Sequence, residues 1–208
     1  MKEEVFRSKF SMVLGWVWMA FTFVNAVDLV LRFSGPDSLV AGAVLAGLSA
    51  AIYATCLRPR VILGEDGVTV RNPLRDYFVP WTAIDGVRVS HAILIDAGDT
   101  TVRCWTPQAS ARERASANRR GAAPARRGLL QTEPIPSKGE QAALEATAGK
   151  THADWVAQQI DERAEAARRK AGDQAGAGAV RVEWGNDTFI ALSIAVVLIV
   201  AALVGQLF

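Results

Sequence analysis

Three long apolar segments dominate the hydropathy pattern of this chain. They cover residues 10–33, 38–57 and 188–208, which are 24, 20 and 21 residues long, and the second and third contain no charged residue. About 20 apolar residues at a helical rise of ~1.5 Å cross the ~30 Å hydrocarbon core of a bilayer. A single segment can do this only as a helix, because a helix satisfies its own backbone hydrogen bonds. The pattern therefore predicts three transmembrane helices.

Between residues 58 and 106 the apolar positions change from helical to alternating spacing. Apolar runs flank Asp66-Gly67, and an Asp-Gly dipeptide in that setting is a strong hairpin-turn signal. Further short apolar runs follow at 77–79, 86–90, 92–97 and 100–105. Regularly spaced short strands with turns between them are typical of an antiparallel sheet or barrel. We expect residues 58–106 to form one β domain.

The segment 151–171 has the pattern of an amphipathic helix. Thr151 is in an N-cap position with Asp154 three residues later, which is close to a capping box. The apolar residues that follow at helical spacing are Trp155, Val156, Ile160 and Ala164. We expect this face to dock on the β domain as a cap, and residues 172–178 to form a flexible tether into the last span.

Residues 107–150 differ in composition, because they are rich in Ala, Arg, Ser, Gly, Pro and Gln and poor in large apolar side chains. Such a segment cannot bury enough apolar surface to offset the entropy of ordering, so we expect a disordered basic linker. Its stretch 112–127 carries six arginines and one acid, Glu113. Two interpretations stay open: a solvated linker, or adhesion to anionic lipid headgroups, to which each basic residue contributes about 1 kcal/mol. The candidate headgroup contacts are Arg112, Arg114, Arg119, Arg120, Arg126 and Arg127.

Two motifs in the β section carry a resemblance to a known family. They are DGVTVRNPLR at 66–75 and VPWTAIDGV at 79–87. Together they resemble bacterial pleckstrin-homology-like (PH-like) domains, and the nearest type is the actinobacterial membrane family named for the low molecular weight protein antigen 6. The resemblance covers about residues 58–106 and, more loosely, 151–170. It implies a strongly bent, two-sheet antiparallel barrel that a helix caps.

Four residues of the second motif form the expected core of this fold. Pro80 would end a strand, Trp81 would plug the barrel, and Ile84 and Val87 would face inward. Members of the family have two spans before the domain, whereas this chain adds the linker and a third span. The expected fold class is an α+β membrane protein: three transmembrane helices plus a cytoplasmic PH-like antiparallel β-barrel or sandwich capped by a C-terminal helix. A fold does not fix an activity, and this resemblance does not imply phosphoinositide binding.

The placement of basic residues predicts a topology. Arginine outnumbers lysine 18 to 5, and only Arg32 lies between the first two spans. By the positive-inside rule, residues 1–9 and the long section after the second span are cytoplasmic, and the C-terminus is outside. A multi-pass protein of the plasma membrane is expected. In an alternative interpretation, segment 10–26 is a signal peptide that is cleaved near Ala26.

Two features inside the spans are candidates for function. Asp28 is an intramembrane acid, but it lies near the outer end of its span and Arg32 is four residues away, so a local ion pair is the simpler interpretation. The second span carries small residues every four positions, which places them on one helix face that lets backbones approach closely. This face either packs within the chain or forms a homo-oligomer. Its members are Gly42, Ala46, Ala50 and Ala54.

The sequence offers no specific catalytic constellation. The cysteines, Cys56 and Cys104, are interpreted as packed thiols, and His91 and His152 have no partner at metal-ligand spacing. No Gly-rich loop is placed to cradle a phosphate. We therefore expect no enzyme activity, no catalytic or metal-binding residue and no cofactor.

Three functions follow, in order of preference. The first is an adaptor that presents the β domain to an unknown membrane or cytoplasmic protein, for example by strand addition at a sheet edge. The second is a sensor of anionic phospholipids, and the third is a minor subunit of a larger membrane assembly. Besides these partners and the lipid bilayer, nucleic acid is not expected, because no aromatic residues are interleaved with the arginines for base stacking.

Overall fold

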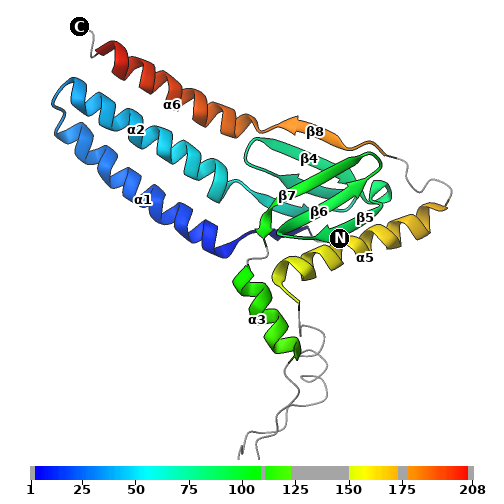
Figure 1. Cartoon of the computed structure of the whole chain (residues 1–208). Coiled ribbons are helices and arrows are strands. Elements are labelled where there is room, and N and C mark those ends of the chain that lie inside the picture. Colours follow the sequence, from blue (N-terminus) through cyan, green and yellow to red (C-terminus); the bar gives the residue numbers. More distant parts are fainter. Residues whose placement is uncertain (1–2, 109–110, 123–149, 173–177, 206–208) are drawn as a thin grey trace, which may run out of the picture.

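The computed structural model of the protein describes residues 3–108, 111–122, 150–172 and 178–205. Among these residues, three helices are long and apolar enough to cross a membrane, in agreement with the hydropathy pattern. They are α1 (Lys9–Leu31), α2 (Pro36–Ile52), which continues into the π-helical turn η1 (Tyr53–Leu57), and α6 (Asn186–Gly205). Figure 1 shows the three helices side by side at one end of a β domain.

Local sequence sets where these helices begin. The Ser8 hydroxyl caps α1 by accepting a hydrogen bond of 3.3 Å from the backbone N–H of Ser11. Between α1 and α2 the chain reverses at Gly35, whose φ of 90° favours glycine. Pro36 then opens α2, in the first turn, where its missing N–H loses no helical bond.

The β domain consists of two antiparallel sheets. The larger sheet, here sheet A, has the strand order β1-β2-β3-β4-β8, and the smaller, sheet B, has the order β5-β6-β7. Sheet A is formed by β1 (Glu4–Phe6), β2 (Arg60–Leu63), β3 (Gly67–Arg71), β4 (Arg75–Pro80) and β8 (Arg181–Trp184). Sheet B is formed by β5 (Gly86–Val89), β6 (Ala92–Ala97) and β7 (Thr100–Gln108), and the 3-10 turn η2 (Trp81–Ala83) leads from β4 to β5.

All three apolar helices are joined to sheet A by short links. Strand β1 runs into α1, η1 runs into β2, and β8 runs into α6 through Gly185. The two outer strands of this sheet, β1 and β8, come from sequence on either side of the predicted β section. Sequence analysis missed both, because three- and four-residue strands leave too short an alternation to recognise.

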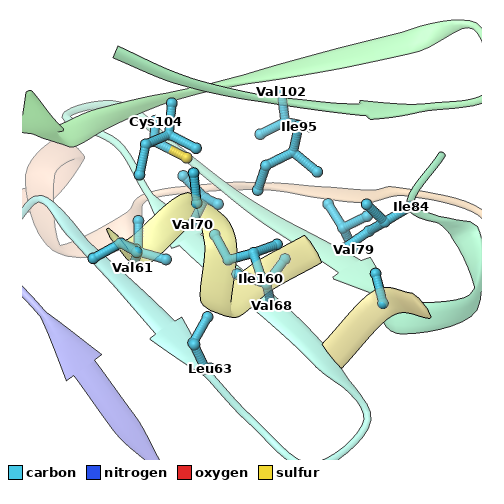
Figure 2. Close-up of a cluster of buried hydrophobic side chains, with 14 of the residues drawn as sticks. Val61, Leu63, Val68, Val70, Val79, Ile84, Ile95, Val102, Cys104 and Ile160 are labelled. Atoms are coloured by element: carbon cyan, nitrogen blue, oxygen red, sulfur yellow. The ribbon is translucent and has the colours of Figure 1, made fainter. Parts of the chain in front are cut away.

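The core lies between the two sheets and the helix α5 (His152–Ala171). Figure 2 shows Ile160 of α5 among aliphatic side chains of both sheets, including Val68, Val70 and Ile95. Complete burial of one such side chain contributes about 1.5–3 kcal/mol. The capping box between Thr151 and Asp154 is present, and three of the four residues predicted for the docking face, Val156, Ile160 and Ala164, are buried. The fourth, Trp155, is 42% exposed, because the buried face is centred on the other side of it and includes Ala153 and Ala157 instead.

The structure decides between the two expected forms of the domain, a barrel or a sandwich. Within the described residues, each strand pairs only inside its own sheet, so the domain is an open sandwich. Sheet A has two strands more than sheet B, and α5 packs on the β5 side of sheet B. A barrel would require the sheets to pair along both borders.

The section predicted to be disordered contains regular structure at its start. Pro107 and Gln108 belong to β7, and α3 (Ala111–Ala122) follows. Alanine and arginine are strong helix formers and no proline interrupts this stretch, which explains the helix in spite of its poverty in large apolar side chains. The rest of the linker, 123–149, lies outside the described residues, as do residues 173–177 of the expected tether.

The cysteines and histidines lie apart from one another. Cys104 is fully buried in the core, and burial raises the pKa of its thiol to about 12, whereas Cys56 is half-buried beside α1. His91 is exposed, and His152 stacks on Trp155 with a centroid distance of 6.1 Å. The described part of the chain contains no group of three His, Cys, Asp or Glu residues that could hold a metal ion.

Candidate functional site

The junction between the helices and sheet A centres on one buried arginine. Arg58 follows η1 directly, and its side chain is only 2% exposed. Its Nε lies 2.8 Å from Asp187 Oδ1 at the start of α6, and its Nη2 lies 2.9 Å from Asp76 Oδ1 on β4. Its Nη1 donates to the backbone carbonyl of Asn72. One guanidinium therefore ties α2, α6 and sheet A together.

Backbone contacts around Arg58 complete this junction. Gly185 N–H donates to Leu74 O at 2.9 Å, and Thr188 Oγ1 donates to Pro73 O at 2.8 Å. A Cβ at Gly185 would collide with the Arg58 guanidinium, so only glycine fits there. The Tyr53 hydroxyl donates to the second oxygen of Asp187 at 3.1 Å.

The junction constrains how the domain sits on the helices. A buried guanidinium is tolerated only when it is paired, because its desolvation is expensive. Arg58 has two carboxylates and a carbonyl, so a change in the angle between α6 and sheet A would break charged contacts. Sequence analysis did not single out Arg58 or Asp187 as functional residues. An arginine directly after one span and an aspartate directly before another is the pattern that could have suggested the pair.

The two edges of sheet A differ in how they are covered. Edge strand β1 contacts α5 through two side chains, by an ion pair of 2.8 Å between Glu4 and Arg163 and an edge-on contact of Phe6 with Trp155 at 5.6 Å. Edge strand β8 pairs only with β4 among the described residues, and all four of its residues are exposed. Val182 is 51% exposed even though its partner across the ladder, Tyr77, packs against the core. Strand β8 is therefore an open edge of the sheet.

Aromatic contacts hold β8 in place beside the helices. The Arg75 guanidinium lies 4.5 Å from the Trp184 ring centroid, and Trp184 packs edge-on against Phe189 of α6 at 5.4 Å. At the other end of the β4–β8 ladder, Arg181 lies 4.6 Å from the Phe78 ring centroid. These contacts order the strand without covering its free backbone edge.

The PH-like motif occupies the turn between the two sheets. Pro80 is the last residue of β4, and Trp81 is 6% exposed, with its Nε1 donating to the carbonyls of Gly64 and Glu65. Ile84 is fully buried, and Val87 is half-buried against the core. The Trp81 ring thus ties the β2–β3 turn to the turn that starts sheet B.

The small-residue face of the second span packs within the chain. A Cβ at Gly42 would lie 3.3 Å from Leu29 of α1, and Ala46 and Ala50 line an apolar cavity shared with α6. Ala50 and Ala54 are each 6% exposed. These residues therefore contact neighbouring helices of the same chain, and the homo-oligomer through this face stays a prediction.

The structure describes only part of the basic stretch 112–127. Arg112, Arg114 and Arg119 lie on α3, whose far end points away from the three apolar helices in Figure 1. Nothing is described for the side chain of Arg120, and Arg126 and Arg127 lie outside the described residues. Asp28 and Arg32 form the expected local ion pair at 3.0 Å.

Comparison with known proteins agrees with this geometry. The architecture is that of a small two-sheet domain with a helix on one side, carried by apolar helices. Residues 58–126 match a family model described as a bacterial PH domain. No curated protein matches, and no solved structure matches. The PH-like nature of the β domain is confirmed, whereas the narrower resemblance to the antigen 6 family receives no support.

Proposed function

We propose that this chain is a multi-pass plasma-membrane protein that displays its PH-like domain at the cytoplasmic face as a protein-interaction (adaptor) module. The observation that carries the proposal is the open β8 edge, held at the end of the helices by the Arg58 junction. An extended segment of a partner would add to β8, taking affinity from backbone hydrogen bonds. No catalytic step and no cofactor are assigned.

The charge pattern supports the cytoplasmic placement. Strand β1, the β domain and β8 lie at one end of the helices, where Arg7, Lys9, Arg58 and Arg60 also lie. The opposite end carries Arg32, already paired with Asp28. Cytoplasmic flanks are enriched in Lys and Arg, so the domain end is proposed to face inward. Protease added to sealed right-side-out cells would then leave the 112–127 stretch intact, and digestion there would contradict this placement.

Photo-crosslinking in intact cells tests the interaction edge. A photoreactive residue replacing Glu183 on β8 should give a discrete protein adduct, whereas one replacing the exposed Arg103 on β7 should not. Adding Val182→Lys to the Glu183 probe should remove the adduct, because lysine on an edge strand blocks pairing. Equal adducts from both probes, or an adduct that survives Val182→Lys, would refute the β8 edge as the interaction site.

A further inference from the structure

Three arginines line up across the helix end of sheet A. Arg60 on β2 is directly opposite Arg71 on β3, and Arg7 follows Phe6, whose ladder partner is Val61, so Arg7 comes beside Arg60. Like charges directly opposite each other destabilise a sheet. The pKa of Arg60 is lowered, mainly by burial and then by the charges of Arg71 and Arg7. We call Arg7, Arg60 and Arg71 the arginine row. Repulsion among their positive charges destabilises this part of sheet A.

Protein carboxylates leave most of this charge unneutralised. In the described part of the chain, no acid forms an ion pair with Arg7 or Arg60. Arg71 Nε lies 3.8 Å from Asp76, which already pairs with Arg58. The Nε atoms of Arg60 and Arg71 are buried and have no hydrogen-bond partner. Buried donors without a partner are uncommon in folded proteins, and they point to a missing acceptor.

The three arginines line one open cavity of about 320 Å³. We call it the arginine cavity, and its walls are formed by Arg7, Arg58, Arg60, Arg71, Trp16, Met19, Tyr53, Leu57 and Asp187. Asp187 is the one carboxylate on these walls, and it already pairs with Arg58 at 2.8 Å. The basic wall comes from sheet A, and the apolar wall comes from α1 and η1. Trp16 is 65% exposed and Trp184 is 57% exposed, and exposed tryptophans at the ends of apolar helices mark the level of lipid headgroups.

Charge and shape together identify the chemistry of the occupant. A guanidinium binds phosphate oxygens through two parallel N–H donors, so the basic wall suits a phosphate. The apolar wall continues along the exposed side of α1, for example at Val17, which suits an acyl chain. A free inorganic anion would contact only the basic wall.

We propose that the arginine cavity binds the phosphate-bearing headgroup of one anionic phospholipid, whose acyl chains lie along α1. The bound lipid neutralises the arginine row and fixes the depth and tilt of the PH-like domain at the membrane surface. This site uses neither the arginines of α3 nor the β8 edge, and it shares only Arg58 and Asp187 with the junction. Its test therefore does not depend on the proposed protein partner.

Lipid binding by the full-length protein tests the proposal. The purified chain would be stripped of lipid in detergent and transferred to phosphatidylcholine nanodiscs with increasing phosphatidylglycerol, and bound lipid would be counted by native mass spectrometry. We expect one retained phosphatidylglycerol, with affinity lower by about fivefold in Arg60→Gln and by about 25-fold in Arg7→Gln/Arg60→Gln. Arg119→Gln on α3 removes the same charge elsewhere and should leave retention unchanged.

Thermal unfolding separates loss of the site from loss of the fold. Without anionic lipid, Arg60→Gln should unfold at the same or a higher temperature than the wild type, because it relieves repulsion within the row. With phosphatidylglycerol the order should reverse, because only the wild type gains the full stabilisation.

Three outcomes would overturn the proposal. The first is equal retention of phosphatidylglycerol by the wild type and Arg7→Gln/Arg60→Gln. The second is retention of phosphatidylcholine as strong as that of phosphatidylglycerol. The third is stabilisation by inorganic phosphate or glycerol phosphate equal to that by the lipid, which would assign the cavity to a soluble anion.

Discussion

The β domain and the layer of three apolar helices are packed by different side chains. The core of the domain is filled with large aliphatic residues that are 0% exposed, such as Leu63, Ile93 and Ile160. Where α2 meets α6, the buried residues are alanines, such as Ala50 and Ala195, and large apolar side chains such as Val30 point outward, 75% exposed. Water drives large apolar groups inward, whereas helices in lipid gain little from burying them and meet through small residues. The β domain thus has the packing of a core formed in water, and the helix layer has the packing that helices show in lipid.

Polar contacts follow the same division. In the helix layer, Trp18 Nε1 donates to Ser49 Oγ at 3.1 Å, and Thr22 shares a hydrogen bond of 2.9 Å with the same hydroxyl. Such contacts between helices are what a bilayer-spanning layer uses in place of a hydrophobic core. The two regions meet at Arg58, the one buried arginine among the described residues.

The largest expected effect comes from truncating the domain core. Ile160→Ala should lower the free energy of unfolding of the β domain by about 3–4 kcal/mol, because it removes a fully buried side chain and leaves a cavity. Thermal or chemical unfolding of the full-length protein in detergent, followed by circular dichroism, would measure this loss. Ile199→Ala on α6, where the side chain is 41% exposed, should cost less than about 1 kcal/mol. Equal losses from the two variants would break the contrast between the two regions.

The next effect is at the junction that joins them. Arg58→Ala should cost about 3 kcal/mol, because it leaves two carboxylates without their partner. We take the lower end of the range because the Asp187 side chain is 43% exposed. Unfolding of the full-length protein in detergent would measure the loss. Hydrogen exchange should show that the variant increases the exchange rate of backbone amides in β8 more than in β6. Gly185→Ala should give a similar result through steric collision.

A smaller effect is expected inside the helix layer. Ala43→Leu should cost about 2 kcal/mol, because the added side chain overpacks a position of α2 that is only 4% exposed and does not line the cavity. Ala41→Leu, on the exposed side of the same helix, is the matched control and should be neutral. Crosslinking between cysteines placed on α2 and α6 would show whether the helices separate. If Ala41→Leu were the more damaging variant, the assignment of the packed face would be wrong.

The smallest effect concerns an exposed ion pair on sheet B. Arg88 donates to both carboxylate oxygens of Asp96, at 2.7 and 2.9 Å, and Thr101 donates to one of them, which lowers the pKa of Asp96. A lowered folded-state pKa gives stability that is present above the unfolded pKa of ~3.9 and is lost as the pH falls through the folded value. Asp96→Asn should therefore lower the stability slightly at pH 7 and leave it unchanged at acid pH, so that the acid limb of the stability curve becomes flatter. A loss at pH 7 comparable to that of Ile160→Ala would contradict this ranking.

The sequence by itself determined the elements whose signal is local and long. Three apolar runs exceed the thickness of a bilayer, alternating spacing marks residues 58–106 as β structure, and the Thr151 cap with its apolar stripe defines α5. These follow from hydrogen bonding and burial within one segment, so neighbouring residues suffice to predict them.

Only the tertiary structure decided how these elements meet. Strands β1 and β8 are too short to be recognised alone, and they exist because β2 and β4 offer them free backbone groups. The Arg58 junction joins residues 129 positions apart, and the arginine row joins Arg7 to Arg60 and Arg71 across two ladders. Pairing over such separations depends on the register of strands and the angle of helices, and no local pattern encodes either.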